Sequence, residues 1–148
     1  MHIAVGCDHR GLTLKQHIMG LLDQEGHSYK DFGCYDESPA DYPDIAEKVG
    51  GAVTEGKCER GILVCSTGIG MSMAANKIRG VRAALCHNMF TAQRSRQHND
   101  SNVLCLGESV VKQGLAEEMV REYLATEFEG GRHEGRLCKI ADLEAGNG

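Results

Sequence analysis

The sequence predicts an α/β protein built on a parallel sheet, and three observations support that prediction. Short runs of aliphatic and β-branched residues alternate with segments in which apolar residues recur every three or four positions. The alternation follows the order βαβαβαβαβα, which places helices on both faces of a parallel sheet. The length of 148 residues, with 41% hydrophobic residues, suits one domain with a buried core. We therefore predict one domain over residues 1–148: a three-layer, doubly wound, Rossmann-like fold with a five-stranded sheet and a C-terminal helical arm.

Five runs have the composition of buried strands. They are HIAVGCD (2–8), SYKDFG (28–33), GILVCS (61–66), VRAALC (81–86) and NVLCLG (102–107). The segments between them have helical periodicity. The first predicted helix ends near Gly26, and the second runs from Pro43 to near Gly56. The third starts near Met71, and the last two cover 89–97 and 109–127. EGGRHEGR (129–136) is interpreted as a glycine-broken basic turn before a short terminal helix, and AGNG (145–148) as a frayed end.

Charge and hydropathy exclude several classes of partner. Sixteen Lys and Arg residues against 21 Asp and Glu residues give a net charge of −5, and no basic run stands out. We therefore expect no nucleic-acid partner and no membrane partner. No apolar run is long enough to span a membrane, and charged residues appear early, unlike in a signal peptide. A cytoplasmic location is expected.

The seven cysteines do not have the pattern of a disulfide framework or a zinc cluster. Their number is odd, and no CxxC pair occurs. Most of the thiols are therefore expected to be reduced and buried as small apolar groups. This holds above all for the cysteines in the strand runs, Cys7, Cys86 and Cys105.

Three predicted elements end in residues that can do chemistry. Ligands of open α/β sheets bind outside the carboxyl ends of the strands. The first strand ends in CDH (7–9), the third in CSTGIG (65–70), and the helix after the fourth strand in QHND (97–100). The sequence therefore predicts that a thiol, two imidazoles, a carboxylate and a glycine-rich turn share one rim of the sheet.

The turn CSTGIG has the features of an anion-binding loop. Gly68 and Gly70 allow positive φ angles and close approach of a ligand, and the turn leads into a helix N-terminus that favours negative charge. It is not a dinucleotide fingerprint, because Met73 stands where a third glycine is needed. It is not a phosphate loop either, because no Gly-Lys-Ser/Thr follows. A purely structural strand-to-helix turn is the alternative.

Cys65 lies immediately before that helix. A thiol at a helix N-terminus can give up its proton near neutral pH and serve as a general base. We predict that the Cys65 sulfur borders an open cleft beside the amides of the turn. A core cysteine is the alternative.

The remaining polar candidates each have a structural alternative. His9 and His98 can cap helices or satisfy carbonyls, and Asp8 can cap the first helix. Arg132 and Arg136 lie four residues apart, so on a helix both guanidinium groups share one face and can bind a phosphate or carboxylate. A solvated basic face is the alternative for this pair. Asp8, His9, Cys65 and His98 could bind a metal ion, but no metal site is expected, because they come from separate loops without paired ligand spacing.

Six motifs are distributed over nearly the whole chain. They are AVGCDHRG (4–11), DYP (41–43), ILVCSTGIGMSMAANK (62–77), GVRAALC (80–86), SRQHNDSNVL (95–104) and EGGRHEGR (129–136). Together they resemble the ribose-5-phosphate isomerase B family, a group that also includes the galactose-6-phosphate isomerase subunits. The cysteine followed by TGxG and ANK, with QHND further along, makes the resemblance specific.

The resemblance implies an aldose–ketose isomerase, without metal or cofactor, that acts on a phosphorylated sugar through a cis-enediolate. Ribose 5-phosphate and ribulose 5-phosphate are the leading pair. Cys65 would move the proton between C1 and C2 with Thr67 nearby, and the turn of Ser66, Gly68 and Gly70 would hold the enediolate oxygen. The other implied roles are ring opening by His98 and Asp8, hydroxyl binding by Asn99 and Tyr42, and phosphate binding by His9, Arg132 and Arg136. The resemblance also implies a homodimer or dimer of dimers with shared active sites, in which EGGRHEGR reaches the neighbour.

Two positions differ from the pattern of relatives. Met71 stands where some relatives have a glutamate base, which leaves Cys65 as the expected base. Ser109, in NVLCLGES, stands where many relatives have a phosphate-binding arginine. Either one phosphate ligand is missing, or the substrate places its phosphate differently.

Three other functions compete with the leading one. The first is an isomerase of another phosphosugar, such as galactose or allose 6-phosphate or a tetrulose phosphate. The second is a non-catalytic phosphosugar-binding module, which would keep the anion-binding turn but would not need a thiol and an imidazole together. The third is a nucleotide-dependent oxidoreductase.

Overall fold

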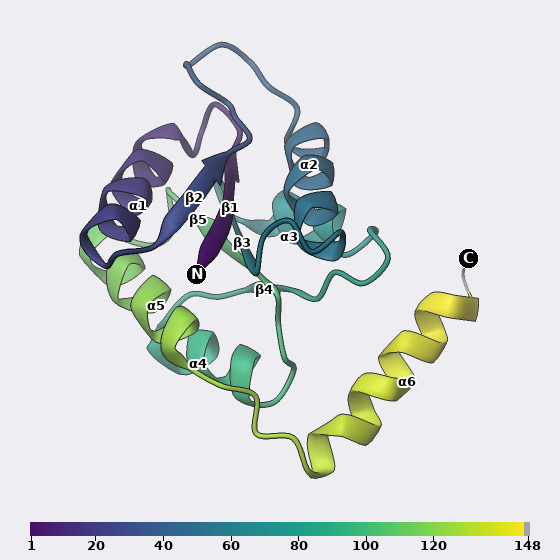
Figure 1. The fold of residues 1–148 in the computed structure, drawn as a ribbon. Coiled ribbons are helices and arrows are strands. Elements are labelled where there is room, and N and C mark those ends of the chain that lie inside the picture. Colours follow the sequence, from purple (N-terminus) through teal and green to yellow (C-terminus); the bar gives the residue numbers. More distant parts are fainter. Residues whose placement is uncertain (147–148) are drawn as a thin grey trace.

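The computed structural model describes residues 1–146, and within this range the chain alternates strands and helices as predicted (Figure 1). The strands are β1 (His2–Cys7), β2 (Ser28–Asp31), β3 (Arg60–Cys65), β4 (Ala83–Leu85) and β5 (Val103–Gly107). The helices are α1 (Leu12–Gln24), α2 (Tyr42–Thr54), α3 (Ile69–Ala75), α4 (Met89–Gln97), α5 (Gln113–Ala125) and α6 (Arg132–Gly146). Each helix in this part of the chain is too short or too polar to cross a bilayer.

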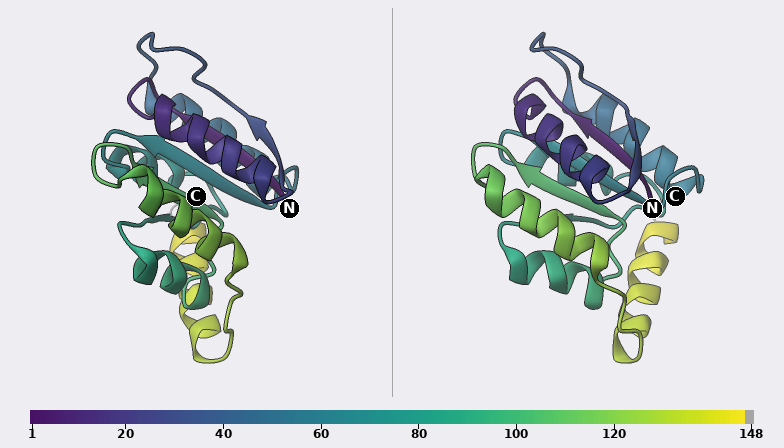
Figure 2. Two further views of the ribbon diagram at one scale, coloured as in Figure 1. Left: turned by 90° about the vertical axis from the view of Figure 1, so that its left-hand side faces the viewer. Right: turned by 60° about the vertical axis from the view of Figure 1, so that its left-hand side comes forward.

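The five strands form one parallel sheet in the order β2-β1-β3-β5-β4, which confirms the predicted doubly wound class. The crossovers place α1, α4 and α5 on one face and α2 and α3 on the other (Figures 1 and 2). β3 lies at the centre, paired with β1 on one side and β5 on the other. Its last residue, Cys65, pairs with Gly107 of β5, and the residue before it, Val64, pairs with Cys7 of β1.

The core has two halves, one on each face of the sheet. Ile62 and Val64 of β3 pack in the cluster of α1 and α5, whereas Leu63 and Cys65 pack in the cluster of α2 and α3. All four side chains are at most 4% exposed. Because both faces are covered, β3 shows the continuous apolar sequence of a buried parallel strand instead of an alternating one.

Element boundaries differ from the sequence prediction mainly at ends. The fifth helix, predicted over 109–127, begins only at Gln113, because residues 108–112 form a turn in which Val110 is 52% exposed. The terminal helix is longer than predicted and already begins at Arg132, inside the expected basic turn. It includes Ala145 and Gly146 of the segment expected to fray; Asn147 and Gly148 lie outside the described residues.

Helix α6 stands outside the three layers as an arm (Figures 1 and 2). Its first turn lies near the end of α4, where the Glu129 N–H donates to the Gln97 carbonyl. Near its other end, the Glu144 carboxylate accepts the Gly80 N–H at 3.0 Å. A cavity of about 870 Å³ remains between this arm and β4, lined among others by Val81, Ala83 and Ile140.

Candidate active site

The structure places eight of the predicted site residues at the carboxyl ends of β1 and β3. We call them the carboxyl-edge group; they are Asp8, His9, Tyr42, Cys65, Ser66, Thr67, Gly68 and Gly70. Backbone hydrogen bonds join the residues that follow β1 and β5 to the end of β3. The Asp8 N–H donates to the Val64 carbonyl, and the Glu108 N–H donates to the Cys65 carbonyl. This part of the predicted rim is therefore present.

The turn after β3 directs backbone N–H groups at its own side chains. The Gly68 N–H donates to the Cys65 Sγ at 3.1 Å, and the Ile69 N–H donates to the Thr67 Oγ1 at 3.2 Å. Gly68 has a φ of +79°, and a Cβ atom there would lie 2.5 Å from Leu85 Cδ1. Glycine is thus required at position 68 both for backbone conformation and for space.

Gly70 lies inside α3, where its only close neighbour is an aromatic side chain. A Cβ atom at this position would lie 2.7 Å from the Cζ atom of Tyr42. The Tyr42 ring, 40% exposed at the start of α2, therefore rests directly on the turn. The close approach that the glycine pattern predicts is thus made by an aromatic side chain of the same chain.

The Cys65 sulfur is less accessible than the sequence led us to expect. Cys65 is 4% exposed and belongs to the apolar cluster on the α2 and α3 face. The reason is strand alternation, since Cys65 follows Leu63 by two residues and points to the same covered layer. Thr67, two residues beyond, is exposed, so the turn passes from core to surface within three residues.

Asp8 and His9 hold local structure at this edge. Asp8 is 7% exposed, and its Oδ1 accepts the Arg10 N–H at 2.9 Å. It does not cap α1; instead Glu108 accepts the Leu14 N–H at 3.0 Å, a cap that the sequence reasoning missed. The His9 Nδ1 accepts the Ala40 N–H at 3.2 Å, which ties the loop of residues 34–41 to the end of β1.

The other four predicted residues lie elsewhere, which corrects the prediction of a single rim. We call His98, Asn99, Arg132 and Arg136 the amino-edge group. Helix α4 starts after the carboxyl end of β4 and runs back for nine residues, roughly 13 Å. Its last residues therefore reach the amino ends of the strands, where Asp100 bonds to Arg82, the residue before β4.

His98 is stacked on a second histidine that the sequence reasoning did not single out. Its ring lies 4.2 Å from the ring of His133, with 16° between the planes. Glu129 Oε2 lies 3.9 Å from His98 Nε2 and 3.5 Å from His133 Nε2. Burial, together with the charges of His98 and Arg132, lowers the pKa of His133. The only sequence signal for this cluster is the EGGRH motif itself.

The same three side chains are close enough to be considered as metal ligands, since their ligand atoms lie within 4.8 Å of one another. The ring planes argue against it. A histidine nitrogen directs its lone pair in the plane of its ring. Two nearly parallel, stacked rings cannot both direct a nitrogen at one ion, so this arrangement favours a stacked histidine pair beside a carboxylate.

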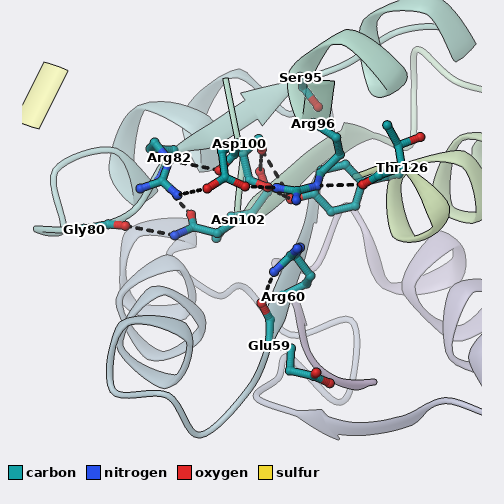
Figure 3. Close-up of polar contacts among 12 residues, drawn as sticks. Glu59, Arg60, Gly80, Arg82, Ser95, Arg96, Asp100, Asn102 and Thr126 are labelled. Carbon is teal, nitrogen blue, oxygen red and sulfur yellow. Dashed lines mark hydrogen bonds and ion pairs between the residues drawn. The ribbon is translucent and has the colours of Figure 1, made fainter. Parts of the chain in front are cut away.

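A buried ionic network fixes the end of α4 (Figure 3). Arg96 is 2% exposed and donates to Asp100 Oδ1 at 2.9 Å, to the Ser101 carbonyl and to the Thr126 carbonyl. Arg82 binds the other carboxylate oxygen of Asp100 at 3.1 Å. Asp100 of the QHND motif is therefore structural, and the i, i+4 spacing of Arg96 and Asp100 was the available signal.

Ser109 and Met71, the two positions expected to differ from relatives, both follow strands at the carboxyl edge. Ser109 is exposed, and its Oγ lies 3.0 Å from the Ser66 Oγ. Its N–H also donates to the Ser66 carbonyl at 2.9 Å. Met71, in contrast, is fully buried in the α2 and α3 cluster. An arginine at position 109 would thus start beside the turn, whereas position 71 faces the core.

Comparisons with known proteins decide the family. Residues 3–140 match the Ribose/Galactose Isomerase family. The chain belongs to this family. It is 45% identical to ribose-5-phosphate isomerase B of Escherichia coli, over 96% of this chain and 95% of that protein. It is 42% identical to a D-erythrulose-4-phosphate isomerase of Pectobacterium atrosepticum, over 97% and 95% of the two chains.

A solved structure agrees with the fold over the entire chain. Ribose-5-phosphate isomerase B of Clostridium thermocellum is 47% identical, covers 100% of both chains and superposes with a TM-score of 0.99. The predicted family, the Rossmann-like fold and the isomerase class are thereby confirmed. Relatives of this family act on different sugar phosphates by name, so membership alone leaves the sugar open.

Proposed function

We propose that the protein interconverts ribose 5-phosphate and ribulose 5-phosphate through a cis-enediolate, with Cys65 as the base. The observation that carries the proposal is the Cys65 sulfur at the end of the central strand, with the Gly68 N–H directed at it. This arrangement occurs in a chain whose relatives in Escherichia coli and Clostridium thermocellum are named ribose-5-phosphate isomerase B.

The carboxyl-edge group would perform the proton transfer. Cys65 would take a proton from one of the two carbons and return it to the other, and the hydrogen bond from Gly68 can persist while the sulfur is charged. Thr67 and Ser66, exposed and half-buried beside it, are placed to contact the sugar. Amides of the turn would hold the enediolate oxygen, an effect typically worth about 3 kcal/mol per donor.

The amino-edge group would bind and open the sugar. His98 would assist ring opening together with Asp8, and Arg132 and Arg136 would bind the phosphate with His9. Asn99 and Tyr42 would bind hydroxyl groups. Within one chain, however, His98 and both arginines lie at the opposite end of the sheet from Asp8 and His9. The proposal therefore requires two copies, with the amino-edge group of one chain completing the carboxyl-edge group of the other.

A homodimer, or a dimer of dimers, follows from this division. Helix α6 supports it, because the arm stands outside the layers (Figure 2). Its first turns also carry the exposed side chains of Arg132 and Arg136. Exposed apolar side chains lie on the same arm, with Ile140 at 47% and Leu143 at 69% exposure. An arm with both features is suited to contact a second chain.

The test is a single assay with matched variants. With excess chelator, the purified protein should isomerise ribose 5-phosphate and should carry solvent deuterium into the recovered aldose. Cys65→Ala should lower kcat by about 10³-fold, because a positioned general base typically contributes about 10²- to 10⁴-fold. Cys138→Ala, which removes an exposed thiol on α6, should leave kcat unchanged. An unchanged rate in Cys65→Ala would show that the base is elsewhere.

A second candidate keeps the chemistry and changes the sugar. Ser109 is the observation that favours it, because the expected guanidinium is missing beside the turn. The erythrulose-phosphate relative shows that the family includes a four-carbon substrate by name. Comparing kcat/KM over four-, five- and six-carbon aldose phosphates separates the two, since a misplaced phosphate loses transition-state binding.

A further inference from the structure

Two thiols face each other where β1 meets the loop of residues 34–41. The Sγ atoms of Cys7 and Cys34 lie 3.7 Å apart. The backbone fixes both residues, because the Cys7 N–H donates to the Gly33 carbonyl and the Cys34 N–H donates to the Cys7 carbonyl, each at 2.6 Å. This pair has no part in the isomerisation proposed above.

We propose that Cys7 and Cys34 form a reversible disulfide that tethers the 34–41 loop to the end of β1. The bond requires the sulfurs to approach by roughly 1.6 Å, to the usual length of about 2.05 Å. Rotation of the two side chains can supply this movement, since the backbones are already joined by hydrogen bonds. The proposal therefore predicts a cross-link that leaves the backbone of β1 in place.

The surroundings assign different roles to the two sulfurs. Cys7 is fully buried, whereas Cys34 is only half-buried and is the one that a small oxidant meets first. Burial raises the pKa of the Cys7 thiol well above its ordinary range, and the nearby Lys15 charge opposes that rise. The Lys15 ammonium donates to the Cys34 carbonyl at 2.6 Å and to the two Asp31 carboxylate oxygens at 2.7 and 2.8 Å. The proximity of the two sulfurs, and not an unpaired cation, therefore carries the second step.

The oxidant class is a hydroperoxide. The Cys34 sulfur attacks one peroxide oxygen, the O–O bond breaks, and a sulfenic acid and one molecule of water form. The Cys7 sulfur then attacks the Cys34 sulfur, the S–O bond breaks, and a second water leaves with the Cys7 thiol proton. Two thiols are oxidised to one disulfide while hydrogen peroxide is reduced to water. A dithiol reductant reverses the bond.

The tether lies at the base of the carboxyl-edge group. Cys7 immediately precedes Asp8 and His9, and the loop that starts at Cys34 returns to His9 through the Ala40 N–H. The disulfide would therefore close the loop at a second point beside His9. An effect of the disulfide on substrate binding rests on the proposed function, whereas the formation of the disulfide does not.

The experiment treats the native protein with hydrogen peroxide, alkylates the remaining thiols and maps the peptides by mass spectrometry. We expect a reducible cross-link between the peptides of Cys7 and Cys34, and a mass loss of about 2 Da relative to the dithiol. The Tm of the cross-linked protein should rise by about 5 °C and return on reduction, because the bond restricts the unfolded chain. Cys34→Ser should show neither change. Cys138→Ser, which lacks a different accessible thiol, should behave like the wild type.

Two results would overturn the proposal. One is oxidation of Cys34 to a sulfinic or sulfonic acid with Cys7 still alkylatable after unfolding. The other is a cross-link that lowers the Tm, which would mean that the backbone must distort to form it. Neither readout uses isomerase activity, so an inactive protein that still forms the cross-link would count against the proposed function alone.

Discussion

The two groups of candidate site residues are held in place by different means. The carboxyl-edge group sits on the ends of buried parallel strands and on a turn whose geometry depends on Gly68. The amino-edge group sits on the end of a helix and the start of an exposed arm, which are fixed by charged side chains. Backbone pairing thus positions the proposed proton transfer, and ion pairs position the proposed recognition of the sugar phosphate.

This difference has a consequence for stability. Strand ends are shared with the core, so few single substitutions there would move the turn without unfolding the protein. The end of α4, in contrast, depends on Arg96 and its partners. Removing that guanidinium is expected to disturb the amino-edge group first.

The largest expected effect on stability is that of Arg96→Met. The substitution fills similar space but leaves Asp100 without one of its two arginines and the Thr126 carbonyl without its donor, while the Ser101 carbonyl keeps only the Tyr123 hydroxyl. We expect a loss of about 3 kcal/mol in the free energy of unfolding, measured by urea titration; partial exposure of Asp100 keeps it below the cost for a fully buried pair.

Arg94→Met is the matched control on the same helix. Arg94 is half-buried and donates to Gln97 within its own helix, so its removal should cost less than about 1 kcal/mol. Equal losses in the free energy of unfolding of the two variants would show that the Arg96 network stabilises the amino edge no more than Arg94 does.

The contrast between the two groups also explains how far sequence reasoning reached. The sequence prediction of a helix over 89–97 matches α4, Met89–Gln97. The capping box of Asn88 and Thr91 at its start is a local signal that the prediction did not use. The position of Cys65 and its turn followed from the rule for strand ends. The rule failed for His98 because it places only the start of the helix that follows a strand. His98 lies at the end of α4, which is at the other edge of the sheet.

Other features could not be read from the sequence because they depend on distant contacts. Glu108 caps α1 across the sheet, and Glu129 joins His98 to His133 from a loop after α5. The strand order, with β5 between β3 and β4, is likewise set by tertiary packing. The pairings of Arg96 with Asp100 and of Glu129 with His133 had a local signal in their four-residue spacing.

A smaller effect is expected at the carboxyl edge from Ser109→Arg. The new guanidinium would start beside Ser66 and add one charge-assisted contact to the phosphate. The KM for ribose 5-phosphate should fall by about 3- to 10-fold with kcat nearly unchanged. Ser109→Gln, similar in reach but neutral, should leave KM close to the wild-type value. A KM that stays constant or rises in Ser109→Arg would indicate that the phosphate lies away from this position.

The smallest effect is a pH dependence at the amino edge. Burial lowers the pKa of His133 below its unfolded value of 6.5, so protonation favours the unfolded chain. Neutral His133 therefore contributes fully to the free energy of unfolding above the unfolded value. This contribution is lost as the pH falls from that value toward the lower pKa of the folded state. The urea midpoint should therefore drop between about pH 7.5 and 5.5, and should drop less in His133→Gln. His17→Gln, an exposed histidine on α1, should follow the wild type, and identical slopes in all three proteins would contradict the assignment.

The most direct test of the divided site is complementation between two inactive chains. One chain carries Cys65→Ala, and the other carries Arg132→Gln with Arg136→Gln. If each site combines two chains, a mixed dimer has one intact site, and an equal mixture refolded together should recover about a quarter of the wild-type activity. If every site residue came from one chain, a mixture confirmed to contain mixed dimers by native mass spectrometry would remain as inactive as its parts.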